Sequence, residues 1–66
     1  MAILPAQCRA GRALVEMSQK DLARLAGVSS RTVLDFENGK HEPIRATIAT
    51  MQRALEEAGV EFTNGD

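Results

Sequence analysis

The stretch SQKDLARLAGVSSRTV, residues 18–33, begins as an amphipathic helix, stops at Ala26 and begins again almost at once. Ser18 and Asp21 fit a capping box, in which each side chain satisfies the other residue's backbone amide, although Asp replaces the usual Glu. Gly27 adopts a left-handed conformation without steric cost and so ends a helix, and Ser29 has the oxygen that caps the next one. We predict a helix from Ser18, a break at Gly27 and another helix from Ser29.

A break this short sets one helix steeply across the next. Only a small side chain fits where two such axes cross, and Ala23 is small enough. The second of the two helices then projects from the body of the protein. Its first turn has the size to enter the major groove of DNA, which is about 12 Å wide. The interrupted helix therefore suggests a surface that reads DNA.

The rest of the chain predicts a compact all-α fold of four helices with a core over about residues 5–58. A first helix begins near Pro5 and ends near Glu16, and a fourth runs from about Ile44 to Ala58 after a loop over residues 37–43. The tail, residues 59–66, is expected to form a short strand that reaches the Asn64-Gly65 turn. Helical spacing predicts these buried residues: Leu4, Cys8, Gly11 and Val15; Leu22, Ala23 and Ala26; Val33 and Phe36; Ile48, Met51, Leu55 and Ala58.

Length and composition exclude several classes of protein. The chain has 66 residues, of which 44% are hydrophobic and 26% charged, so we expect one globular domain over residues 1–66. The single cysteine, Cys8, excludes an internal disulfide framework and is expected to be a small core hydrophobe. His41 has no second ligand at metal spacing, so no metal site is predicted. Without a phosphate loop or a nucleophile–base pair, neither an enzyme nor a cofactor is expected.

Charge is unevenly distributed along the chain. The formal net charge is −1, but residues 1–40 hold six basic and four acidic side chains, a balance of +2, whereas residues 41–66 hold two basic and five acidic ones, a balance of −3. A polyanion should therefore bind the first part. The start of the chain is too weakly apolar for a signal peptide and no membrane segment follows, so we expect a cytoplasmic protein.

Residues at fixed spacings across the interrupted helix carry a family resemblance: Gln19, Leu22-Ala23, Ala26-Gly27-Val28-Ser29, Thr32-Val33 and Phe36-Glu37-Asn38-Gly39. This pattern resembles the lambda-repressor-like, Cro-type helix-turn-helix family, also called the xenobiotic-response-element (XRE) type. The resemblance covers about residues 8–58, and the ending AGVEF is similar to that of small bacterial members. It implies a bacterial or phage DNA-binding domain with its helix-turn-helix over residues 18–37 and its recognition helix over about residues 29–37.

The resemblance also implies roles for polar residues. Base contacts are expected from the recognition helix: Ser29, Ser30, Arg31, Leu34 and Asp35. Phosphate contacts are expected from Gln19, Thr32, Asn38 and Lys40. Alternatives remain open, because Gln19 can be merely solvated, Leu34 merely exposed and Asn38 only a turn cap. Arg31 can bind phosphate instead of guanine, and Asp35, which departs from the amides common in the family, can simply pair with Arg31.

One pair is implied to be structural. Family members pair an arginine at the position of Arg12 with a glutamate at the position of Glu37, partly buried between the first and third helices. An unpaired charge there would be heavily destabilising. Arg9, in contrast, is expected to be a solvated surface charge.

These features predict a sequence-specific transcriptional regulator, a repressor that binds double-stranded DNA as a homodimer. Its half-sites should be spaced about 34 Å apart. Dimerisation, or binding of a protein partner, is expected through the fourth helix and the tail. Leu14 and Leu25, which lie outside the predicted buried faces of their helices, fit such a surface. The alternative is a protein-interaction module or the antitoxin half of a toxin–antitoxin pair with weak or no DNA binding. The acidic balance and Asp35 favour this alternative slightly.

Overall fold

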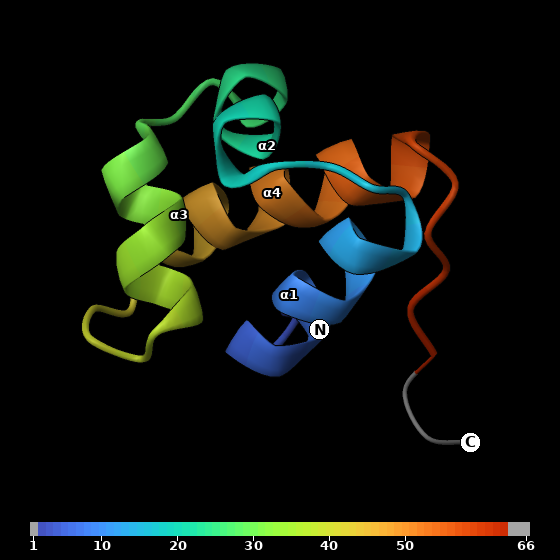
Figure 1. The fold of residues 1–66 in the computed structure, drawn as a ribbon. Coiled ribbons are helices and arrows are strands. Elements are labelled where there is room, and N and C mark those ends of the chain that lie inside the picture. The colour runs from blue at the N-terminus through green and yellow to red at the C-terminus, as the bar shows by residue number, and fades with distance from the viewer. Residues whose placement is uncertain (1, 64–66) are drawn as a thin grey trace.

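Four helices form the fold of residues 2–63, the part of the chain that the computed structural model describes (Figure 1). They are α1 (Pro5–Leu14), α2 (Gln19–Ala26), α3 (Ser30–Glu37) and α4 (Arg45–Glu57). The predicted all-α, four-helix fold is confirmed, and the helices end within about two residues of their predicted bounds. In this part of the chain, no helix combines the length and the apolar character needed to cross a membrane.

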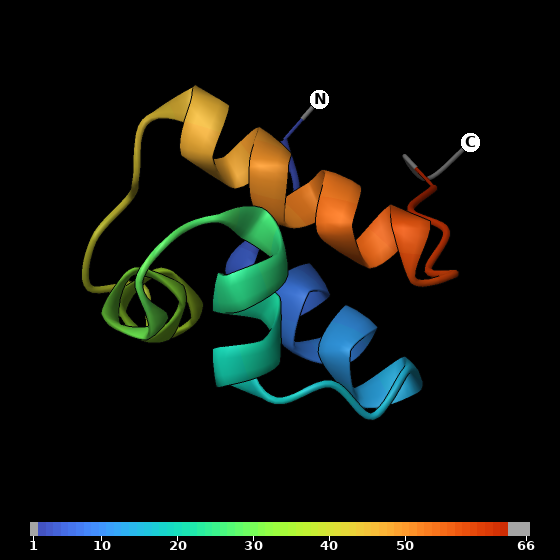
Figure 2. The same ribbon diagram turned by 90° about the horizontal axis from the view of Figure 1, so that it is seen from above.

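The two middle helices cross steeply. In Figure 1, α3 is seen from the side and α2 nearly along its axis, and Figure 2 shows the reverse. Helix α2 packs against both α3 and α4, while α1 also packs against α3 and α4. Ala23 of α2 is buried, in agreement with the need for a small side chain in this helix. Because α1, α2 and α4 form the body of the domain, α3 is left along one side of it.

The break between α2 and α3 forms as predicted. Gly27 has a φ of 73°, and its N–H donates to the carbonyl of Arg24 at 3.3 Å while the N–H of Val28 donates to that of Ala23 at 2.9 Å. These two bonds make a Schellman ending, which requires a left-handed residue. Ser29 Oγ then accepts the N–H of Thr32 at 3.1 Å and begins α3. The chain therefore restarts a helix within three residues of ending one.

The other helix ends follow related rules. The capping box of α2 is present, since Ser18 Oγ accepts from the Asp21 amide at 3.0 Å and the Ser18 amide donates to the Asp21 carboxylate at 3.4 Å. Helix α4 begins after Ile44 without a side-chain cap. Helix α1 also ends in a Schellman pair of bonds, although the left-handed residue there is Glu16, with a φ of 55°.

The core lies where the four helices meet. The correctly predicted buried residues are Cys8, Gly11, Leu22, Ala23, Val33, Phe36, Ile48, Met51 and Leu55. Val15 and Ala26 are half-buried and pack against this core. Sequence spacing did not find Ile3, Ala54 and Val60, which are also buried. Helix α3 contributes only Val33, Phe36 and Glu37 to the buried set.

Two predicted core positions are wrong, and both lie just outside a helix. Leu4 is 63% exposed because it is the extended residue before α1, so helical spacing does not carry its side chain onto the buried face. Ala58 is exposed because it follows the last residue of α4. Ile3 and Val60, their near neighbours in the chain, are buried instead.

The tail packs against α1, and no strand forms in it as far as Thr63, where the described residues end. The predicted Asn64-Gly65 turn lies beyond them. The Val60 amide bonds to the Leu55 carbonyl at 3.0 Å, which turns the tail back onto the domain. A Cβ at Gly11 would lie 3.3 Å from Phe62 Cζ and 3.4 Å from a Val60 methyl. The side chains of the tail and of Leu55 in α4 therefore pack closely against Gly11, where a larger residue would crowd them.

Candidate nucleic-acid interface

The outer face of α3 is polar and accessible. Ser30 is exposed, and the Arg31 side chain is 74% exposed. Arg31 Nε lies 3.3 Å from Asp35 Oδ2, one turn further along the helix. The ion pair weighed as an alternative role for these residues is thus present in the free protein. Leu34 is half-buried.

The side chains of Ser29 and Thr32 form hydrogen bonds at the start of α3. Their hydroxyl oxygens lie 2.9 Å apart, so one donates to the other. Ser29 Oγ also accepts the Thr32 amide. The structure therefore gives both hydroxyls a capping role, in addition to the DNA contacts predicted for them.

The loop after α3 turns back over the end of that helix. The amides of Lys40 and His41 donate to the Asp35 carbonyl at 2.9 and 3.4 Å. The side chains of Asn38, Lys40 and His41 are exposed. Within residues 2–63, no hydrogen bond is formed by the Asn38 side chain, so the turn depends on its backbone. This loop leaves one cationic side chain, Lys40, near the end of α3.

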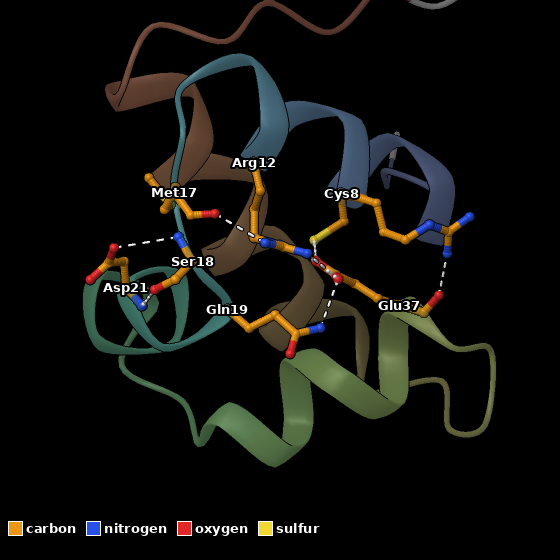
Figure 3. A network of polar contacts seen from close by, with 8 residues as sticks. Cys8, Arg12, Met17, Ser18, Gln19, Asp21 and Glu37 are labelled. Carbon is orange, nitrogen blue, oxygen red and sulfur yellow. Dashed lines mark hydrogen bonds and ion pairs between the residues drawn. The ribbon is translucent and has the colours of Figure 1, made fainter.

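A buried carboxylate joins the first three helices (Figure 3). Glu37, at the end of α3, is 1% exposed. Arg12 of α1 reaches it with two nitrogens, Nε at 2.6 Å from Oε2 and Nη2 at 2.7 Å from Oε1. The predicted pair of Arg12 and Glu37 is thus bidentate, and Arg12 Nη1 also donates to the Met17 carbonyl at 3.0 Å.

Two further side chains complete this cluster. Cys8 Sγ donates to Glu37 Oε2 at 3.1 Å, and Gln19 Nε2 donates to Glu37 Oε1 at 3.0 Å. Gln19 is therefore held by the protein rather than merely solvated. An amide nitrogen carries two N–H bonds, so Gln19 retains one donor for another acceptor at the start of α2. We call Cys8, Arg12, Gln19 and Glu37 the carboxylate cluster.

Arg9 is exposed, as predicted, but it is not only solvated, because its Nη1 donates to the backbone carbonyl of Glu37. Helix carbonyls in the last turn lack partners within the helix, and a cation there also complements the helix dipole. Arg9 therefore ties α1 to the end of α3. The sequence placed Arg9 on the same helix as Cys8 and Arg12. It could not indicate the acceptor of Arg9, because Glu37 lies 28 residues further along the chain.

The carboxylate cluster makes stability depend on pH. Burial alone would raise the pKa of Glu37, but hydrogen bonds from Arg12, Gln19 and Cys8 outweigh it and hold the pKa below its usual range. A carboxyl whose pKa is lower in the folded state contributes stability above its unfolded pKa, and this is lost as the pH falls through the folded pKa.

We therefore expect the free energy of unfolding to fall as the pH is lowered from about 5, since an unfolded glutamate titrates near about 4.3. Urea denaturation at a series of pH values measures this slope. Hydrogen bonds with Ser18 also lower the pKa of Asp21, so Asp21 contributes to the same pH dependence. The Glu37→Gln variant keeps Asp21, and its unfolding free energy should therefore depend less steeply on pH than that of the wild type. Equal slopes in the two proteins would contradict the assignment.

The Cys8 thiol should be unreactive in the folded protein. Burial, together with the hydrogen bond to Glu37 and its charge, raises the pKa of Cys8 to about 12. Thiol reagents attack the thiolate, so at pH 8 we expect labelling at least about a hundredfold slower than in the unfolded chain, the limit that transient unfolding sets for a domain with a stability of about 3–10 kcal/mol. Absorbance after addition of an aromatic disulfide reagent, with and without denaturant, measures both rates. A native rate within tenfold of the unfolded rate would refute this.

Comparison with protein families agrees with this architecture. A model of the helix-turn-helix family matches residues 9–63. The chain belongs to the helix-turn-helix family, in its Cro/C1-type, XRE branch. A search of curated proteins gave no match. Helix-turn-helix proteins of this type bind DNA, and the family is typically non-enzymatic. In DNA-binding helix-turn-helix motifs the second helix enters the major groove, and α3 has the second place in the motif of this chain.

Proposed function

We propose that this helix-turn-helix protein is a sequence-specific transcriptional repressor. The observation that supports this best is the exposed polar face of α3, where Ser30 and Arg31 point away from a body held by α1, α2 and α4. A bidentate arginine contact to guanine distinguishes it from other bases by about 1–3 kcal/mol. Ser29, Ser30, Leu34 and Asp35 complete the proposed base-reading surface.

Phosphate contacts are proposed at both ends of this surface. Gln19 has its second amide N–H at the first turn of α2, where the helix dipole favours anions. The half-buried Thr32 and the exposed Asn38 and Lys40 are proposed to contact the DNA backbone because of their positions in and just after α3. Such contacts fix the register of a protein on DNA, while base contacts give specificity.

We also propose that two copies act together on a two-fold operator. One small domain neutralises few phosphates and binds weakly by itself, and a dimer doubles the contacts. Leu14 beside the tail is 76% exposed and Leu25 of α2 is 54% exposed. These side chains, with α4 and the tail, are the proposed contact with the second copy.

A second candidate function is a protein-interaction module, such as an antitoxin component. The carboxylate of Asp35 lies on the proposed DNA-facing surface, where its pairing with Arg31 cancels one positive charge. The part of the chain after residue 40 is also acidic overall. This alternative requires weak binding to every duplex.

Selection of binding sites from random duplex DNA tests the two candidates. We expect a two-fold consensus, binding that weakens steeply with salt, and a loss of about five- to hundredfold in affinity for Arg31→Ala on the selected site. Gln19→Ala should weaken binding to all sequences alike. Glu16→Gln, in the turn after α1, is the control. No consensus, or unchanged affinity in both variants, would favour the interaction module. Sedimentation with and without operator tests the dimer.

A further inference from the structure

We propose that Asp35 is a positioning residue, which orients Arg31 to read one guanine, so that the operator carries an obligatory G·C pair at that position. This inference rests on the proposed function and deepens it. Without Asp35, Arg31 would be a flexible cation that binds phosphate of any sequence.

The ion pair between Arg31 and Asp35 uses an atom that leaves the two terminal nitrogens of Arg31 free to contact a base. Asp35 Oδ2 meets Nε of Arg31, at 3.3 Å. A guanidinium has five N–H donors in one plane, and four of them belong to the two terminal nitrogens. Within residues 2–63, those terminal nitrogens of Arg31 have no hydrogen-bond partner. Two parallel donors of this kind match O6 and N7 of guanine.

Asp35 is fixed more firmly than its partner. Its side chain is 17% exposed, whereas that of Arg31 is 74% exposed. The Asp35 carbonyl holds the loop through the amides of Lys40 and His41. A fixed acceptor beside a mobile arginine restricts the directions in which the arginine can point.

Another ion pair in the motif shows the contrast. Arg24 and Asp21 of α2 lie 3.5 Å apart, with side chains 70% and 50% exposed. There the aspartate is exposed and the contact uses a terminal nitrogen, Nη2. That contact occupies one donor of a terminal nitrogen, whereas the contact in α3 leaves both terminal nitrogens free. The contact through Nε in α3 is therefore a feature of this pair, and not of every ion pair in the motif.

Removing the Asp35 carboxylate should have different effects if Asp35 positions Arg31 and if it is merely an acidic side chain near DNA. If Asp35 is only an acid near DNA, its removal strengthens binding to every sequence, because repulsion of phosphate is lost. If Asp35 positions Arg31, its removal weakens discrimination at one base pair while binding to random DNA is unchanged or stronger. Discrimination and overall affinity must therefore be measured separately.

The probe is the selected operator with 7-deazaguanine replacing each guanine in turn, which removes the N7 acceptor. Fluorescence anisotropy gives the affinity of the full chain for each duplex and for a random duplex. For the wild type, we expect one position at which the substitution weakens binding by about five- to hundredfold. In Asp35→Ala and in Arg31→Ala, the penalty at that position should fall below about twofold.

Two controls separate charge from position. Asp35→Asn retains an acceptor oxygen and should keep part of the penalty. Glu16→Gln removes one negative charge from the connection between α1 and α2, which begins on the side of the molecule away from α3 in both views (Figures 1 and 2). It should keep the full penalty. Circular dichroism establishes that each variant is folded.

Four results would overturn the inference. Two of them are retention of the wild-type penalty in Asp35→Ala and retention of it in Arg31→Ala. Absence of a sensitive guanine in the wild type would also exclude the proposal, while leaving the proposed function intact if a consensus is still selected. If the wild type selects no sequence, both the proposed function and this inference fail.

Discussion

Replacing Glu37 with alanine is expected to lower the free energy of unfolding by about 3–5 kcal/mol, the cost of breaking a buried ion pair by removing one partner. Arg12 would lose both nitrogen contacts to the carboxylate, and Gln19 and Cys8 would lose their acceptor. A domain of this length has a total stability of about 3–10 kcal/mol. At the lower end of this range the variant would be largely unfolded at room temperature, and at the upper end it would remain folded with about 5–7 kcal/mol of stability.

Denaturant titration, with a stabilising osmolyte if needed, measures this loss. Glu56→Ala is the matched control, because Glu56 is exposed and, among the described residues 2–63, its carboxylate accepts only from Gln52, at 3.2 Å. Its effect should be within about 0.5 kcal/mol. Arg12→Met in the Glu37→Ala background should cost less than Arg12→Met alone, since the two residues share one interaction. A loss below about 1 kcal/mol for Glu37→Ala would show that the cluster contributes little.

Replacing Phe36 with alanine should cost about 3–5 kcal/mol, as is typical of a buried aromatic. Phe36 is 3% exposed and, with Val33, provides the apolar contact of α3 with the core. It also borders a hollow of about 220 Å³ beside the segment before α1. Truncation would enlarge this hollow, and the cost grows with the cavity that remains.

The measurement is again denaturant unfolding, followed by DNA binding at a temperature where the variant is folded. Phe36→Leu should recover much of the loss, since it leaves a smaller cavity. Leu25→Ala, at a residue 54% exposed, is the control for loss of an apolar side chain and should have a small effect. If Phe36→Ala unfolds like Leu25→Ala, α3 is held by its polar contacts rather than by the core.

The sequence was sufficient for features that depend on neighbouring residues. Ser18, Gly27 and Ser29 act through bonds that span three to five residues, so their chemistry specifies where α2 ends and α3 begins. Helical spacing likewise found the buried faces inside each helix. It failed at Leu4 and Ala58, because the spacing rule does not apply to residues outside a helix.

Contacts between distant residues were less accessible. The resemblance supplied the pairing of Arg12 with Glu37, but nothing in the local sequence showed that Gln19 and Cys8 share the same carboxylate. Their separations from Glu37 are 18 and 29 residues, and only the packing of α1 and α2 against α3 brings them together. The same packing accounts for Arg9, whose acceptor is a backbone carbonyl and has no sequence signature.

The ending of α1 has a consequence for how stable the protein can become. Glu16 is exposed and has a φ of 55°, a conformation that costs a residue with a side chain roughly 1–2 kcal/mol. Glycine would avoid this strain but would gain freedom in the unfolded chain, which offsets part of the benefit. Asparagine, which tolerates this region better than most residues, keeps more of the gain. The natural chain therefore lies below its attainable thermostability, and an engineer seeking a more heat-resistant variant should begin at this turn.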